Sequence, residues 1–321
     1  MCRKTTLFFF ILISLFLSAQ SQDRIKINLD EDWKFHLGNA SDPAKDFNYS
    51  IANIFSKSGA AGNSAINPKF NDSSWRTLNL PHDWAVELPF ANSLNFDVMA
   101  HGYKPVGGLF PETSIGWYRK KFFVDKNDSS KKISIRFDGI YRDANIWLNG
   151  FFVGNNKSGY SGIEYDVSDF VKYGEENTLV VRVDASQYEG WFYEGAGIYR
   201  HVWLVKTDKF HINPNELFIH SKQTNKSAIV SVEVPVVNDN SRATNGDAYT
   251  YITDRNGKKI AEGKATSFTI PANAKTLVKQ NINVAHAHLW SIEDPYLYRV
   301  VTILKSGNKI IDSLNTRFGI R

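Results

Sequence analysis

The residues best suited to chemistry lie in one stretch, Tyr188 to Leu204, which reads YEGWFYEGAGIYRHVWL. It places Trp191 and Tyr193 between Glu189 and Glu194, and its glycines allow the positive φ angles of a tight loop. An aromatic side chain can form a flat wall for a sugar ring, while a carboxylate accepts hydrogen bonds from sugar hydroxyls. The same composition also suits a buried turn whose aromatic rings fill a core, so both interpretations stand at this point.

Other kinds of site are not indicated by the sequence. The eight histidines are scattered without the spacing of metal ligands, and no HExxH pattern occurs. Neither a G-x-S-x-G nucleophile elbow nor a phosphate-binding glycine loop is found. The formal net charge of +5 is spread along the chain without a lysine or arginine block, which argues against nucleic acid as a partner. We therefore expect no metal site, no cofactor and no nucleic-acid partner.

The first 21 residues are predicted to be a secretory signal peptide. Arg3 and Lys4 precede an apolar run from Leu7 to Leu17, and small residues follow at Ala19 and Ser21. We expect cleavage near Ser21, a secreted or periplasmic product, and no membrane span in the rest of the chain. The single cysteine of the sequence falls within this peptide, so we expect a mature chain without disulfides.

Short strands must position the aromatic stretch. Aromatic residues make up 14% of the chain and recur in short segments between turn residues, which favours a β-protein. Alternating segments such as GWYRKKFFV, KISIRF, ANIWLN and NTLVVRV predict an antiparallel sandwich or jelly roll. Upstream, the segment Ile25 to Phe35 predicts one half-buried strand. The long irregular stretch Ala85 to Ser114 has the length typical of a functional loop.

A second domain is predicted to begin between Thr207 and Asn215. About seven short alternating strands follow in roughly a hundred residues, which is typical of an immunoglobulin-like sandwich, here without its cysteines. Asn256-Gly257 is the strongest hairpin signal in the chain. We therefore predict an all-β chain: a signal peptide (1–21), a jelly-roll domain (22–207) and an immunoglobulin-like sandwich (208–318).

Several stretches resemble the N-terminal sugar-binding jelly roll of glycoside hydrolase family 2, which includes bacterial β-galactosidases, β-glucuronidases and β-mannosidases. They are LPHDW (80–84), GWYRKKF (116–122), FDGIYRDANIWLNG (137–150), GYSGIEYDVSDFV (159–171) and GAGIYRHVWL (195–204). LWSIEDPYLYRVVTIL (289–304) and RFGIR (317–321) resemble the close of the family's immunoglobulin-like domain. The resemblance covers nearly all of the mature chain, and the loop composition leans towards the β-galactosidase branch.

The resemblance implies a retaining glycosidase whose chemistry lies on a TIM barrel that follows these two domains. Retention requires two carboxyl groups about 5 Å apart, and in the family both are glutamates of the barrel. Residues 319–321 would be the stub of that barrel. We therefore assign no catalytic residue within this sequence and predict that the 321-residue chain alone is inactive.

The resemblance also suggests which residues contact substrate. In the family, the loop equivalent to the aromatic stretch reaches the active site of the barrel, which would place Glu189 or Glu194 against sugar hydroxyls with Trp191 and Tyr193 as a wall. The segment HGYKPVGGLFPET (101–113) corresponds to another loop of the same subsite. Its Tyr103 and Phe110 could stack on a sugar or pack the loop onto its own domain, and both alternatives stay open.

The leading hypothesis is a non-catalytic N-terminal portion of a secreted, β-galactosidase-like exo-glycosidase, with a terminal β-linked sugar as ligand and the catalytic barrel in cis. A secreted carbohydrate-binding module that functions alone is the first alternative. An inactive, truncated remnant is the second. The sugar, its linkage and the oligomeric state are left open, with a homo-oligomer among the alternatives.

Overall fold

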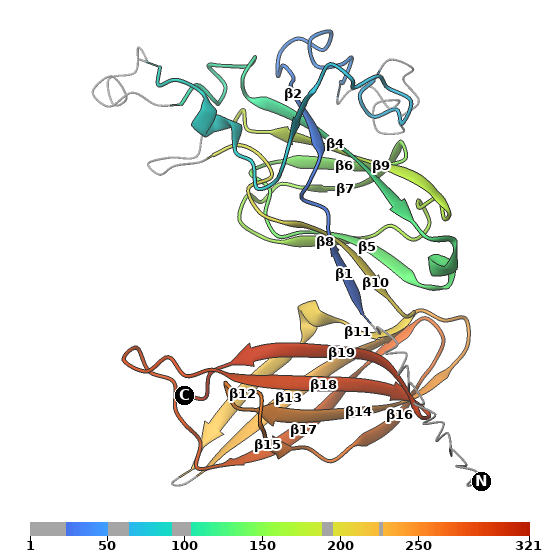
Figure 1. Ribbon diagram of the computed structural model, residues 1–321, viewed down its shortest axis with the longest axis vertical. Helices are drawn as coiled ribbons and strands as arrows, with labels where there is room; N and C mark the ends of the chain where they lie inside the picture. The colour runs from blue at the N-terminus through green and yellow to red at the C-terminus, as the bar shows by residue number, and fades with distance from the viewer. Residues whose placement is uncertain (1–23, 51–63, 92–103, 188–194, 225–226) are drawn as a thin grey trace, which may run out of the picture.

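The computed structural model describes residues 24–50, 64–91, 104–187, 195–224 and 227–321. These residues form two β-sandwiches stacked end to end, the first above the second in Figure 1. The helical content of the described residues is limited to short 3-10 turns, so the prediction of an all-β chain is confirmed. None of the helices in this described part is long and apolar enough to cross a membrane.

The first sandwich consists of a six-stranded and a four-stranded sheet, and all neighbouring strands are antiparallel. In spatial order the larger sheet contains β3 (Arg76–Leu78), β2 (Trp33–Leu37), β4 (Ile115–Val124), β9 (Glu175–Asp184), β6 (Ala144–Leu148) and β7 (Phe151–Asn156). The smaller sheet contains β1 (Ile25–Asn28), β10 (Val202–Thr207), β5 (Lys132–Phe137) and β8 (Ile163–Asp166), and it lies nearer the second sandwich (Figure 1).

The larger sheet is covered on both faces. Its inner face packs against the smaller sheet, with Val181 and Leu204 among the buried residues. On its outer face Trp117 and Trp147 stack with ring centroids 6.0 Å apart, and Tyr49 from the preceding loop covers them. Because both faces are covered, consecutive residues are buried over the first half of β4 and most of β9, whichever face their side chains occupy.

One prediction about the start of the chain is wrong. The segment from Ile25 to Phe35 does not form a single strand, because β1 pairs with β10 of the smaller sheet while β2 pairs with β3 and β4 of the larger one. Between them Asp32 has a φ of 54°, which redirects the backbone from one sheet to the other. Both halves keep the alternating pattern, so the sequence alone did not reveal the break.

The second sandwich contains nine strands among the described residues, where about seven were expected. One sheet is built on β13 (Ser227–Asn238), which pairs with β11 (Phe210–Ile212) and β12 (Phe218–Gln223) on one edge and β17 (Ala274–Ala285) on the other. The other contains β14 (Thr244–Thr253), β15 (Lys259–Glu262), β16 (Thr266–Ile270), β18 (Tyr298–Ser306) and β19 (Lys309–Phe318). The predicted hairpin at Asn256-Gly257 is confirmed, since β14 and β15 pair around it and Gly257 has a φ of +87°.

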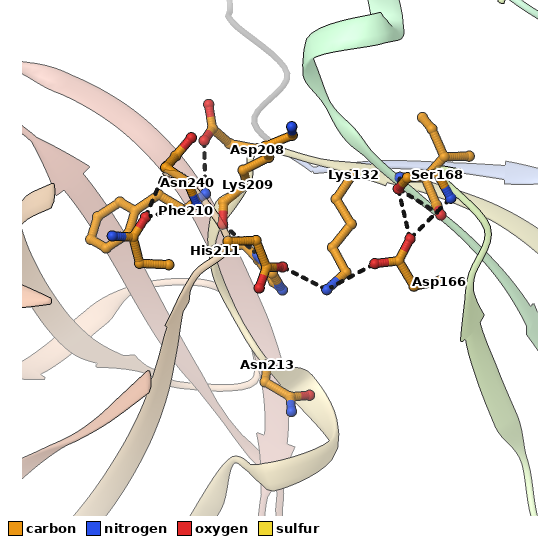
Figure 2. A network of polar contacts seen from close by, with 12 residues as sticks. Lys132, Asp166, Ser168, Asp208, Lys209, Phe210, His211, Asn213 and Asn240 are labelled. Atoms are coloured by element: carbon orange, nitrogen blue, oxygen red, sulfur yellow. Dashed lines mark hydrogen bonds and ion pairs between the residues drawn. The ribbon is translucent and has the colours of Figure 1, made fainter. Parts of the chain in front are cut away.

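Ion pairs connect the two sandwiches. Arg24, just before β1, donates through Nε and Nη2 to both carboxylate oxygens of Asp312 on β19, at 3.0 and 2.7 Å. Lys132 Nζ on β5 lies 2.7 Å from Asp239 Oδ2, just beyond β13, and 3.4 Å from Asp166 Oδ2 (Figure 2). Two cations of the first sandwich therefore bind carboxylates of the second.

Candidate functional site

Three segments that are distant in the sequence meet at one end of the first sandwich, here called the loop end. They are residues 80–88, 139–143 and 195–200. The backbone N–H of His82 donates to the carbonyl of Ile198 at 2.8 Å, and that of Trp84 donates to the carbonyl of Ala196 at 2.9 Å. The stretches that the sequence singled out as LPHDW and GAGIYR therefore lie side by side like two strands.

Gly197 joins the third segment to this pair. It exchanges two backbone hydrogen bonds with Tyr141, at 2.8 and 2.7 Å, and its φ is +134°. A Cβ at this position would lie 2.5 Å from both the His82 carbonyl oxygen and the Tyr118 hydroxyl. Glycine is required here because both the backbone angle and the available space exclude a side chain.

Asp83 anchors the residues that follow segment 188–194. Its Oδ1 accepts hydrogen bonds from Ala85 N at 2.9 Å and from Ala196 N at 2.8 Å. The first bond caps the 3-10 helix η1 (Trp84–Glu87), and the second holds the chain just beyond residue 194. Asp83 thus fixes one end of the aromatic stretch relative to the sheet.

A cluster of four polar side chains, Arg76, His82, Glu87 and Tyr118, lies next to this arrangement. His82 Nε2 lies 2.7 Å from Arg76 Nη2, and since arginine only donates, this nitrogen accepts and the proton is on Nδ1, 2.8 Å from the Tyr118 hydroxyl. Burial lowers the pKa of His82, in agreement with a neutral ring, so its 3.2 Å contact with Glu87 is not an ion pair. Hydrogen bonds from Arg76 lower the pKa of the Glu87 carboxyl. The four side chains bind one another, and the Tyr118 hydroxyl also binds the backbone of Ile198, which indicates a positioning role.

A second loop, residues 104–114, packs against η1. Trp84 Nε1 donates to the Thr113 carbonyl at 2.8 Å, and Lys104 Nζ donates to the Leu88 carbonyl at 2.6 Å. Within the loop, the Ser114 hydroxyl contacts the Phe110 carbonyl at 2.7 Å. The residues that flank segment 92–103 are therefore fixed to the same loop end as those that follow segment 188–194.

The two loops expose apolar side chains to solvent. Phe90, Leu109 and Val86 are 70%, 74% and 58% exposed. Lys104 Nζ lies over the Phe90 ring, 4.3 Å from its centre, in a cation–π contact. Exposed apolar residues next to fixed polar groups are typical of a binding surface.

Only one of the predicted contact residues lies in the described part of the chain. That residue is Phe110, which is partly buried. The other five, Glu189, Trp191, Tyr193, Glu194 and Tyr103, lie outside the described residues, and their roles stay predictions. Phe90 and Lys104 were not predicted as contact residues, although both lie in the long irregular stretch from Ala85 to Ser114 that has the length of a functional loop.

No metal site is found among the residues that the structure describes, because no three histidine, cysteine, aspartate or glutamate side chains there gather in a suitable group. The acidic residues of the loop end are occupied in other ways. Asp83 binds backbone N–H groups, and Glu87 binds Arg76. The chemistry that this surface supports is binding through hydrogen bonds and apolar contact.

Comparisons with known proteins point the same way. The family model "Glycosyl hydrolases family 2, sugar binding domain" matches residues 28–208, and the model "Glycosyl hydrolases family 2" matches residues 210–321. The chain is 33% identical to the β-galactosidase BoGH2A of Bacteroides ovatus, over 95% of this chain and 32% of that protein. It is also 33% identical to a putative β-glucuronidase of Formosa agariphila, over 97% of this chain and 26% of that protein.

A solved structure shares the fold. The crystal structure of a glycosyl hydrolase family 2 member from Bacteroides cellulosilyticus superimposes with a TM-score of 0.74 at 32% identity, covering 92% of this chain and 36% of that one. The chain therefore spans about a third of the length of the relatives it matches. By the match of the sugar-binding model to more than half of its residues, this chain belongs to glycosyl hydrolase family 2.

Proposed function

We propose that this chain is the non-catalytic N-terminal portion of a secreted, retaining exo-glycosidase that hydrolyses terminal β-glycosidic bonds, with β-galactosides as its substrates. The observation that carries the proposal is the convergence of residues 80–88 and 195–200 on one loop end, which holds the residues that follow the predicted substrate loop. The β-galactosidase and β-glucuronidase names of the relatives support the substrate class at the level of β-linked sugars.

In this proposal the first sandwich supplies substrate contacts to a catalytic barrel in the same polypeptide. The two catalytic carboxylates would belong to that barrel, as retention requires a pair about 5 Å apart. Segment 188–194, with Glu189, Trp191, Tyr193 and Glu194, would reach the sugar from one side. The loop that contains Tyr103 would reach it from the other. The proposal also includes that the first 21 residues are a signal peptide, which is removed during secretion.

Two measurements test it together. We expect the purified 321-residue chain to release no nitrophenol from nitrophenyl β-galactoside or β-glucuronide above the buffer rate. We expect the native secreted product to have an intact mass far above that of 321 residues and to cleave nitrophenyl β-galactoside faster than nitrophenyl β-glucuronide. Hydrolysis by the 321-residue chain would overturn the proposal. A native mass equal to this chain without its leader would favour a carbohydrate-binding module that functions alone.

A further inference from the structure

A small cavity lies at the joint between the two sandwiches, away from the loop end. Its volume is about 210 Å³, and its walls come from β5, β8 and β10 of the first sandwich and from β11, β13 and the turn η3 (Pro214–Glu216) of the second. Pockets for drug-sized ligands start at roughly 300 Å³, so a ligand here would have the size of one small ring.

The wall of the cavity contains polar groups without a protein partner. Within the described part of the chain, the hydroxyls of Ser134 and Thr207, Nε2 of His211 and the carboxylate of Glu164 make no hydrogen bond or ion pair, although all four residues line the cavity. Ser134, Thr207 and His211 are only 5%, 4% and 6% exposed. Their polar atoms are not among the fully buried unpartnered atoms of the described residues, so they face the open space of the cavity, where the hydroxyls of a ligand can reach them.

The charges around the cavity exclude an anionic ligand. Both cations of the wall are already neutralised. Arg24 pairs with Asp312. Lys132 pairs with Asp239 and with Asp166, and Figure 2 shows its contact with Asp166. Among the described residues the carboxylate of Glu164 forms no ion pair but interacts electrostatically with Lys26, so the wall offers no unpaired cation. A phosphate or carboxylate would meet Glu164 without a free cation to bind it.

The unmatched groups suit the hydroxyls of a neutral ligand. His211 Nδ1 lies 3.3 Å from the Lys209 carbonyl and can donate to it, which leaves Nε2 as an acceptor. Glu164 is a second acceptor, and the hydroxyls of Ser134 and Thr207 both donate and accept. Acceptors together with hydroxyls that both donate and accept, around a space the size of one ring, match a polyol.

We propose that this cavity is a second carbohydrate site that binds one neutral, polyhydroxylated ring. Hydroxyls of the ring donate to Glu164 and to His211 Nε2 and accept from Ser134 and Thr207. Since the walls belong to both sandwiches, the bound ring bridges the joint. The site shares no residue with the loop end and requires no catalytic barrel, so it stands apart from the proposed glycosidase function.

The test follows the ring protons of His211 by NMR in the 321-residue chain, with the signal assigned by its loss in His211→Gln. Addition of galactose to about 50 mM is expected to shift this signal with a dissociation constant in the millimolar range. Glu164→Ala is expected to weaken binding about tenfold or more, because it removes a charged hydrogen-bond acceptor. The matched control is Glu175→Ala, an exposed glutamate at the start of β9 outside the cavity wall, and it leaves binding unchanged.

Three results would overturn the proposal: no shift of the His211 signal with galactose, equal affinity in Glu164→Ala, or a larger shift with inorganic phosphate than with galactose. The other histidine signals report whether each variant is folded. A native product that fails to cleave the galactoside, or whose mass equals that of this chain without its leader, would refute the proposed function. Neither result would change the NMR measurement of binding at the cavity. Binding at the loop end alone would leave the His211 signal unshifted.

Discussion

Replacement of Gly197 by alanine should lower the free energy of unfolding through both backbone strain and overpacking. Its φ of +134° is costly for alanine, by about 1–3 kcal/mol. The added Cβ would also lie 2.5 Å from the His82 carbonyl oxygen and the Tyr118 hydroxyl. The His82 backbone is held by its N–H bond to Ile198 and the Tyr118 hydroxyl by the His82 ring, so such overpacking costs about 1–3 kcal/mol more. We therefore expect Gly197→Ala to destabilise the first sandwich by about 2–6 kcal/mol.

Gly107→Ala is the matched control in the same sandwich. Its φ is +109°, but the nearest atom to an added Cβ is the Ser186 carbonyl oxygen at 3.9 Å, so only the strain of about 1–3 kcal/mol applies. Urea unfolding followed by tryptophan fluorescence measures both variants, because seven of the eight tryptophans precede residue 208. With a slope of about 2 kcal/mol per molar urea, Gly197→Ala should lower the midpoint by about 1–3 M. Equal midpoints for the two variants would refute the packing argument.

Two further predictions concern buried charge. Arg24→Met leaves the fully buried carboxylate of Asp312 without its cation, and we expect it to lower the free energy of unfolding by about 3–5 kcal/mol, measured by thermal unfolding. In the control, Lys279→Met removes an exposed lysine from its pair with Glu233 and should cost at most about 1 kcal/mol. Similar losses in the two variants would contradict the reasoning. Because burial holds the pKa of His82 below its ordinary 6.5, the unfolded chain takes up this proton first and stability is lost as the pH falls below about 6.5. Denaturant unfolding at several pH values should show that the free energy of unfolding falls less steeply with decreasing pH in His82→Gln than in the unchanged chain. The same pH dependence in both would count against a neutral His82.

Local patterns in the sequence determined much of the fold. The two-residue alternation of β13 places Val230, Val232, Val234 and Val236 in the core, as the period of a strand requires. Asn256-Gly257 supplies the positive φ that a tight hairpin needs. These features depend only on residues a few positions apart, which is why they could be predicted along with the two sandwiches and the family.

The candidate site was predicted only in part. The motifs LPHDW and GAGIYR identified the segments of the loop end, but the sequence did not show that their backbones pair or that Asp83 holds Ala196. Of the six contact residues proposed, Phe110 is partly buried and the other five are still predictions. The resemblance located the loops, and the hydrogen bonds between them depend on how the strands are placed in space.

Only the tertiary structure decided which distant groups meet. Asp72, in the loop before β3, accepts a 2.8 Å hydrogen bond from the buried Arg119 of β4. Arg24 reaches Asp312 at the far end of the chain, and their contact brings together the walls of the joint cavity. A strand pattern states which face of an element is buried, but not which element lies opposite, because that choice follows from sheet order and from the packing of one sandwich on the other.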